Sequence, residues 1–534
     1  MSAGASGTGS SAGTATANEP SAELRRDVTV WGSFMWGYAD VGADIYTALG
    51  LVMAAAQGAT SLAFGLAGLV YIMIGLGYTE LASAYPVAGG GQYFALRGLG
   101  DFWGFVAGSA LLLDYTIDIA LFSVASMGYL NFFWPYVFGH AYVKHQIPLG
   151  PLTLYDPVLA VEALALIGFL IWLNIRGIKE SSLFNELLGG IDIATESSII
   201  IFGFLFAWRP ELLAQQWHET MSHFNFHDFA YGSSLAIISF VGLESISQAA
   251  QETRRPATII PRTSITLIFT VFIFAMSFST LGLGVLPWQA FKENISDPVA
   301  TLAHHIPFIG FVAGPFAAFL GLTILAISAN SGIMSASRLT FSMAQLKLVT
   351  PWLDKVHPKY RTPSRTIIFF SLIGAVQVTL SAFTPEILDT LGNMYAFGAT
   401  LGYILVFISL IKLRFSDPYT PRPYRVPLNL PWKRQDGTVV QVPILGIIGM
   451  LGVSTIFFEV VYTHAIGRIA GPSWVALCLV YYIFYRRSQK LPVTGSIPRD
   501  WEKEQIEVLT SAEEYDLLEQ YKLALANRDK KKNG

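Results

Sequence analysis

The chain has 534 residues, of which 53% are hydrophobic and only 13% are charged, and its net charge is −3. Soluble proteins carry about 25% charged residues, so this composition, with a mean hydropathy of +0.48, excludes an ordinary soluble globular protein. The near-neutral charge also argues against a nucleic-acid partner. The single cysteine, Cys478, excludes a disulfide within the chain.

The two ends of the chain differ from its apolar middle, which predicts three segments. Residues 1–22 are rich in Ser, Gly, Ala and Thr, as is typical of a disordered tail and not of a signal peptide. Residues 23–486 form the predicted transmembrane domain, and residues 487–534 form a polar cytosolic tail. In this tail we expect one short amphipathic helix, with Thr510 and Glu513 as a capping box at its start.

Apolar runs follow one another between these tails, most of them close to or above the ~18 to 20 residues that cross a ~30 Å hydrocarbon layer. They predict an all-α membrane protein with about 12 transmembrane helices. The predicted spans are Val30–Ala54, Leu62–Ala84, Phe102–Phe133, Val158–Leu173, Leu187–Trp208, Tyr231–Ala249, Ile265–Leu286, Gly310–Gln345, Thr366–Phe383, Ile387–Leu413, Ile444–His464 and Trp474–Tyr485.

The distribution of Lys and Arg between the loops orients these spans. If the N-terminus is inside, the inner loops carry most of the basic residues, for example in residues 347–365 and 412–434. The outer loops then carry only Lys144, Arg209, Lys292 and Arg468. The positive-inside rule therefore predicts a multi-pass protein of the plasma (inner) membrane with both termini in the cytoplasm.

Acidic residues recur inside the predicted spans, where an ionised side chain costs about 2.5 to 3.5 kcal/mol on insertion scales. They are Asp40, Asp44, Glu80, Asp114, Asp118, Glu162, Asp192, Glu196, Glu244, Asp389 and Glu459. Arg338 is the only Lys or Arg within a long run, and it lies near a helix end. We therefore expect protons or bound cations to neutralise the carboxylates, which predicts that the cargo, the coupling ion or both are cationic.

The first span contains two of these acids, Asp40 and Asp44, around Gly42 and ahead of Tyr46 and Thr47. We predict that the helix is broken here, because freed backbone carbonyls and carboxylates together form a cation site. The alternative is a helix end at which the acids cap the helix or face water.

The third span places Asp114 and Asp118 on one helix face, beside Tyr115. Two carboxylates at this spacing do not both ionise in a dry site, so one is expected to be protonated or to share a cation with the other. The alternative is an aspartate that forms a hydrogen bond with a neighbouring helix.

The sixth span offers a second break point at Gly242, since glycine allows the backbone to unwind or to approach another helix closely. Glu244 and Phe240 lie one turn apart beside it. The alternative is a glycine that only packs helices together. We predict that the residues singled out in the first, third and sixth spans converge on one cavity near the middle of the membrane.

Several motifs resemble signatures of the amino acid–polyamine–organocation transporters. Residues 78–93, YTELASAYPVAGGGQY, resemble the family's E-L-x-x-x-x-P-x-x-G-G-x-Y. Residues 240–244 and 251–261 resemble F-x-G-x-E followed by E-E-T-x-x-P-x-x-x-I-P, and residues 328–339 and 356–363 resemble its eighth-helix region and the loop after it. The resemblance covers about Val30 to Ala470. It implies a LeuT-like fold with a 5+5 inverted repeat and a substrate site at broken first and sixth helices.

Two positions depart from that family. Its first helix carries a glycine-rich turn whose amides hold a substrate carboxylate, whereas Asp40 and Asp44 would repel one. In the fifth helix, the resemblance places Asp192 at the position where proton-coupled members of the family share a lysine. Asp192 is therefore the predicted coupling residue, with Glu196, one turn on, sharing the proton. The alternative is that Asp192 only binds Ser or Thr hydroxyls of a neighbouring helix.

Three functions remain open. The first is a cation(proton)-coupled secondary transporter of amino acids or related amines that works by alternating access. The second is a potassium importer, because the acidic first helix and the Asp114–Asp118 element also resemble potassium importers of this fold, although Asp118 replaces their threonine. The third is a non-transporting membrane sensor. The expected coupling ion is H⁺, with Na⁺ or K⁺ as alternatives.

The sequence gives no sign of an enzyme, since it shows no nucleophile–base pair, metal constellation or nucleotide-binding loop. We therefore expect no cofactor and no resident metal. The expected partners are a small-molecule or cation substrate and the lipid bilayer.

Overall fold

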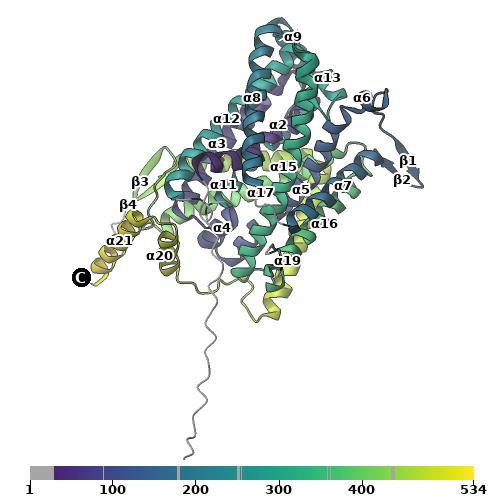
Figure 1. The fold of residues 1–534 in the computed structure, drawn as a ribbon. Helices are drawn as coiled ribbons and strands as arrows, with labels where there is room; N and C mark the ends of the chain where they lie inside the picture. The colour runs from purple at the N-terminus through teal and green to yellow at the C-terminus, as the bar shows by residue number, and fades with distance from the viewer. Residues whose placement is uncertain are drawn as a thin grey trace, which may run out of the picture.

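The computed structural model describes residues 29–533, except residues 88, 177–180, 249, 251–252, 254, 358, 361 and 435–438. The predicted disordered tail, residues 1–22, lies outside the described residues. In the described part, 11 helical stretches are long and apolar enough to cross a membrane. They pack into one bundle (Figure 1), so the protein is a mostly helical, multi-pass membrane protein.

The first of these stretches, Val30–Ala84, is 55 residues long and joins the first two predicted spans. It consists of α1 (Val30–Val41), η1 (Gly42–Asp44), α2 (Ile45–Ala56), η2 (Gln57–Ala59) and α3 (Thr60–Ala84). The chain changes direction at Gln57, where φ is 52° and ψ is −129°.

The predicted break at Gly42 is a tight helical turn and not an unwound segment. Gly42 keeps right-handed helical angles, with φ −64° and ψ −33°, and η1 is a single 3₁₀ turn between two α-helices. A 3₁₀ turn keeps the backbone hydrogen-bonded within the apolar layer, where unbonded groups are costly. The glycine is needed for packing, because a Cβ there would lie 2.7 Å from the ring of Tyr38.

The remaining helices include the other predicted spans, of which α12 and α19 begin earlier than predicted, and several short helices between and after them. They are α4 (Gly90–Leu99), α5 (Asp101–Asn131), α6 (Trp134–Phe138), α7 (Pro157–Arg176), α8 (Ser181–Phe206), α9 (Pro210–Ser222), α10 (Phe226–Ala236), η3 (Ile237–Phe240), α11 (Glu244–Gln248), α12 (Pro256–Val285), α13 (Trp288–Glu293), α14 (Pro298–His304), α15 (Gly310–Gln345), η5 (Pro351–Asp354), α16 (Ser364–Ser381), α17 (Ile387–Ser416), α18 (Ile444–Thr463), α19 (Ala465–Ser488), α20 (Trp501–Ser511) and α21 (Tyr515–Asn533).

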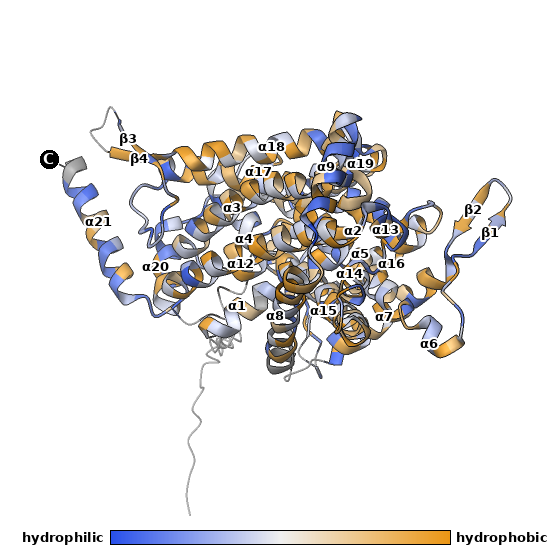
Figure 2. Cartoon of the chain, turned by 90° about the horizontal axis from the view of Figure 1, so that it is seen from above, coloured by the Kyte–Doolittle hydropathy of each residue, from blue (hydrophilic) through white to orange (hydrophobic). Residues whose placement is uncertain are grey.

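Two antiparallel hairpins were not anticipated from the hydropathy pattern. β1 (Gln146–Leu149) pairs with β2 (Leu152–Tyr155), and β3 (Asn429–Lys433) pairs with β4 (Val439–Pro443). They project from opposite sides of the bundle in both views (Figures 1 and 2).

The predicted break in the sixth span is confirmed. After α10 and η3 the chain becomes extended at Val241, with ψ 157°, and Gly242 adopts a φ of +106°. Residues with a Cβ rarely adopt this angle. A Cβ at Gly242 would also lie 3.1 Å from the carboxyl carbon of Asp40, so the glycine is needed for both conformation and space.

Helices far apart in sequence pack in pairs. α2 packs on α10, α3 on α12, α5 on α15 and α7 on α16. The outer faces of these helices carry exposed apolar side chains, among them Leu69 of α3, Ile273 of α12 and Phe319 of α15. Figure 2 shows mostly hydrophobic residues along α18, whereas α20 and α21 carry long hydrophilic segments. The apolar outer faces fit contact with lipid.

Glu80 is not an unpaired membrane acid, as the sequence suggested. Arg414 of α17 donates to both of its carboxylate oxygens, Arg422 lies 3.3 Å away, and the backbone N–H of Val426 donates to it at 2.8 Å. Glu80 is fully buried, and the side chain of Arg414 is 3% exposed. This ion cluster therefore has a structural role, holding α3 to the end of α17.

Substituting Glu80 with glutamine is expected to destabilise the protein strongly. The variant leaves Arg414 and Arg422 buried without their carboxylate, and breaking a buried ion pair costs roughly 3 to 5 kcal/mol. Thermal unfolding in detergent should show a clear drop in melting temperature. Glu519→Gln, at an exposed position in α21, serves as the control and should melt like the wild type. Equal melting temperatures for both variants would contradict the structural role.

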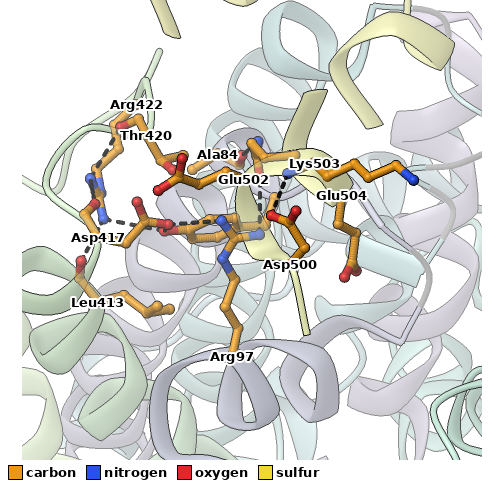
Figure 3. Close-up of polar contacts among 12 residues, drawn as sticks. Ala84, Arg97, Leu413, Asp417, Thr420, Arg422, Asp500, Glu502, Lys503 and Glu504 are labelled. Atoms are coloured by element: carbon orange, nitrogen blue, oxygen red, sulfur yellow. Dashed lines mark hydrogen bonds and ion pairs between the residues drawn. The ribbon is translucent and has the colours of Figure 1, made fainter. Parts of the chain in front are cut away.

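The polar C-terminal segment docks on the bundle through α20. Arg97 of α4 donates to Asp417 at 2.8 Å and to Gln505 of α20 at 3.0 Å, and Gln505 donates to the Ala84 carbonyl at 3.0 Å. Figure 3 shows Arg97 and Asp417 meeting beneath α20. Although burial opposes ionisation, Arg97 and Arg422 hold the pKa of the Asp417 carboxyl below its usual range.

The predicted helix of this segment is present as α21, but its predicted capping box is wrong and a further helix, α20, precedes it. Thr510 lies inside α20, where its hydroxyl donates to the Ile506 carbonyl at 2.7 Å, and Glu513 has a φ of 57° in the turn to α21. The N-cap of α20 is instead Asp500, which accepts from the Lys503 N–H at 3.1 Å. The segment is therefore a pair of helices.

Candidate functional site

Five buried carboxyl groups gather where α1, η1, α5 and α11 meet, and we call them the central cluster: Asp40, Asp44, Asp114, Asp118 and Glu244. Each is at most 6% exposed. Asp44 lies within electrostatic range of Asp118, Asp40 and Glu244, and Asp114 lies next to Glu244. Within the described residues, the charged groups acting on the four aspartates are other members of the cluster.

The unwound sixth span brings the cluster together. Glu244 opens α11 directly after Gly242, and Gly242 makes room for the Asp40 carboxyl. Tyr403 of α17 donates to Glu244 at 3.1 Å. Gly332 of α15 lets that helix approach α5, because a Cβ there would lie 2.7 Å from the Cβ of Asp118. Residues of α1, α5, α11, α15 and α17 are therefore needed to build the site.

Several polar atoms at this site have no hydrogen-bond partner among the described residues. The buried atoms without a partner include both carboxyl oxygens of Asp44 and the hydroxyls of Thr47, Tyr71, Tyr78 and Ser239. The Tyr71 hydroxyl faces Glu244 and Asp44, and that of Tyr78 faces Glu244 and Asp114. Buried polar groups are normally paired, so this set of oxygen atoms can accept a cation or a ligand rich in hydrogen-bond donors.

The predicted site residues are brought together only in part. Asp40, Asp44, Asp118 and Glu244 converge, and Tyr115 lies within range of Glu244 and Asp114. Phe240 adjoins them through Tyr71, on whose ring it stacks with ring centroids 4.9 Å apart.

Tyr46 turns away from the central cluster, so its place in the predicted substrate site is not supported by the geometry. Its hydroxyl donates to Asp192 at 2.7 Å.

Tyrosines of α3 and α17 belong to the site but were missed in the sequence. They are Tyr71, Tyr78, Tyr395 and Tyr403. Tyr71 and Tyr78 are seven residues apart and hence on one helix face. That spacing was a usable signal, but aromatic residues at helical spacing are common in cores.

A second group of four side chains, which we call the coupling cluster after the role predicted for Asp192, lies where α8 crosses α1 and α2. Asp192 and Glu196 of α8 are fully buried. Tyr38 of α1 donates to Glu196 at 2.5 Å and to Asp192 at 3.3 Å, and Tyr46 of α2 donates to Asp192 at 2.7 Å. The donors are thus tyrosines and not the Ser or Thr hydroxyls of the alternative.

The coupling cluster straddles the 3₁₀ turn. Tyr38 precedes η1 and Tyr46 follows it, so Asp192 connects both sides of the turn to α8. A change in the charge of Asp192 alters two hydrogen bonds to the first span at once. The arrangement can therefore link protonation at α8 to the geometry of Asp40 and Asp44.

The chain is similar to known membrane permeases and transporters. The family model for amino acid permeases matches residues 29–485. The chain is 26% identical to the branched-chain amino acid permease of Bacillus subtilis over 416 residues, covering 77% of this chain and 86% of that protein. It is 25% identical to the methylthioribose transporter of the same organism over 485 residues, with coverages of 90% and 97%.

A third relative is human cationic amino acid transporter 4, which is 26% identical over 394 residues, 72% of this chain and 59% of that protein. These relatives are transporters and permeases, and the family match extends over nearly all the membrane-spanning helices described above. The chain therefore belongs to the amino acid permease family of the amino acid–polyamine–organocation transporters.

Proposed function

We propose that the protein is a proton-coupled secondary transporter of amino acids or related amines that works by alternating access. The observation that carries the proposal is the central cluster, five buried carboxyls whose charged neighbours are one another. An ammonium group supplies the positive charge and the hydrogen-bond donors that this cluster lacks. The relatives are named as transporters of amino acids and of methylthioribose, which supports this class of substrate.

The proposed architecture is a LeuT-like 5+5 inverted repeat with 12 spans. Counting the 55-residue stretch Val30–Ala84 as two crossings that meet at Gln57 turns 11 stretches into 12. The pairs α2–α10, α3–α12, α5–α15 and α7–α16 support the repeat, because each joins a helix to its counterpart in the other half. The excess of Lys and Arg in the loops assigned to the inside supports a plasma-membrane protein with both termini in the cytoplasm.

In this mechanism the two clusters have different tasks. Asp40, Asp44, Asp118 and Glu244 bind the substrate's ammonium group. Asp192, helped by Glu196, carries the coupling proton, and its charge sets the hydrogen bonds with Tyr38 and Tyr46. Substrate occupancy and protonation are then linked through η1, which lies between the two tyrosines and contains Asp44.

Potassium import is the second candidate, favoured by the oxygen-rich nature of the central cluster. Both oxygens of Asp44 are buried without a hydrogen-bond partner among the described residues, and alkali cations bind such hard oxygen ligands. No Lys, Arg or His acts among the charged neighbours described for the four aspartates, so a substrate carboxylate finds no cationic side chain there.

A ligand screen separates the two candidates. Purified protein is heated with amino acids, amines and alkali cations in turn, and binding to the native state raises the melting temperature by mass action. We expect an amine-containing solute to stabilise the protein and to compete with its own labelled form for uptake into liposomes. Stabilisation by potassium alone, with uptake of a potassium analogue that amines do not inhibit, would instead identify a cation importer.

A further inference from the structure

A cavity of about 450 Å³ lies apart from both clusters, at the end of α5 that the positive-inside rule places outside. We call it the α6 cavity. Its walls are the end of α5, α6, residues 141–144, the start of α7 and residues 293–305. Two buried acceptors in its lining, Asp156 Oδ2 and Asn131 Oδ1, have no partner among the described residues. Asp156 is 5% exposed and Asn131 is 8% exposed.

Asp297 also lines the cavity. It ends the loop between α13 and α14, which packs closely against α2 and α5. A Cβ at Gly128 of α5 would lie 2.9 Å from Ser296, and one at Gly50 of α2 would lie 2.9 Å from the Ile295 carbonyl. The two glycines therefore allow the segment that ends at Asp297 to reach between α2 and α5. Asp297 is partly buried and lines the cavity, as Gly128 does.

Tyr129 separates this cavity from the coupling cluster. It follows the cavity-lining Gly128 and is 0% exposed. Its hydroxyl donates to the Tyr46 carbonyl at 2.8 Å and accepts from the Val299 N–H at 3.3 Å. Its ring meets the Tyr46 ring edge-on at 5.6 Å. The Tyr129 hydroxyl lies within electrostatic range of Asp297 as well as of Asp192 and Glu196.

We propose that the α6 cavity is the outer entry port for the coupling proton, that Asp297 receives the proton there, and that Tyr129 is the barrier between the port and the coupling cluster. This inference rests on the proposed function. A proton from external water forms an O–H bond with the Asp297 carboxylate. That bond breaks when Tyr129 releases Tyr46 and Val299, and the proton passes through water to the Asp192 carboxylate. The Tyr129 hydroxyl is unchanged at the end.

The titration of Asp297 suits this task. Burial raises its pKa to about 7, so it binds a proton when the outside is more acidic than this and loses it when the outside is more alkaline. The titratable and charged groups around it in the cavity are Tyr136, Tyr142 and Lys144 of the α6–β1 region, Asp156 before α7, Glu293 of α13, and His304 and His305 at the end of α14. Glu162 of α7 lies behind Asn131, which donates to it at 3.2 Å.

The test is Asp297→Asn in proteoliposomes, with the internal pH fixed and the external pH varied. Wild-type uphill uptake should rise as the external pH falls through about 7. The variant should lose this titration, and Asp297→Glu should restore it, which a merely structural role of the loop would not predict. Glu219→Gln, exposed in α9, is the matched control with the wild-type profile. An unchanged pH profile in Asp297→Asn would overturn the proposal.

A second variant keeps the test independent of the fold of the loop. Tyr129→Phe keeps the ring but removes both hydrogen bonds of the hydroxyl, so vesicles without substrate should leak protons faster, as a trapped pH dye reports. Leakage at the wild-type rate would contradict the barrier. If the wild-type protein exchanges no substrate at all, the proposed function fails. If exchange occurs but Asp297→Asn keeps its pH profile, only the port is wrong.

Discussion

Asp192→Asn is expected to abolish uphill, pH-driven uptake while substrate exchange continues. Asparagine keeps an oxygen that accepts from Tyr46 but cannot gain and lose a proton, so the link between the pH gradient and the first span is broken. In reconstituted vesicles the internal substrate should reach only the external concentration. Exchange of labelled for unlabelled substrate should remain, because Asp192 belongs to the coupling cluster and not to the central cluster.

The control for this experiment is Asp516→Asn, a solvent-exposed aspartate of α21. It should accumulate substrate as the wild type does. Uphill uptake at the wild-type rate by Asp192→Asn, with the same pH dependence, would show that another group carries the proton. Loss of both uptake and exchange would point to a structural role for the bonds to Tyr38 and Tyr46.

The second large effect is expected for Glu244→Gln. The side chain keeps its shape and the oxygen that accepts from Tyr403, but the central cluster loses a carboxylate beside Asp40 and Asp114. A hydrogen bond to a charged group contributes about 1.5 to 3 kcal/mol. The KM for an amine substrate should therefore rise about 10- to 150-fold, measured as the concentration dependence of initial uptake.

Tyr403→Phe provides a graded comparison for Glu244→Gln. It removes the hydroxyl that donates to Glu244 and leaves every carboxylate in place, so its KM should rise less than that of Glu244→Gln. An unchanged KM in Glu244→Gln, with a normal melting temperature, would remove this residue from the substrate site.

The helices could be predicted from the sequence because membrane spans depend mainly on local composition. Most predicted runs agree with the observed helices within several residues, and α15 has the same limits as its predicted span, Gly310–Gln345. The helices α12 and α19 each begin nine residues before their predicted spans. The break at Gly242 was also predictable, since a positive φ in the middle of a span requires glycine. Gly42 carried the same local signal, but it meets the ring of Tyr38, a contact that depends on how the turn is packed.

The pairing of the acids could not be predicted, because it depends on residues far apart in the chain. Glu80 and Arg414 are 334 positions apart, and Tyr38 and Asp192 are 154 positions apart. Arg414 looked like an ordinary loop cation at the end of a span. Tyr38 was not singled out because a tyrosine in an apolar run is typical of a core, and Tyr46 was assigned to the substrate site instead of to Asp192. Only the crossing of α8 over η1 shows that both hydroxyls meet one carboxylate.

We propose that an inward proton gradient drives accumulation of an amine-containing solute. The most direct test is uptake by wild-type proteoliposomes with an acidic exterior, compared with the same vesicles after a protonophore has collapsed the gradient. We expect accumulation above the external concentration only while the gradient lasts, together with alkalinisation of the medium as substrate enters. Equal uptake with and without the gradient, and no proton movement with substrate, would contradict it.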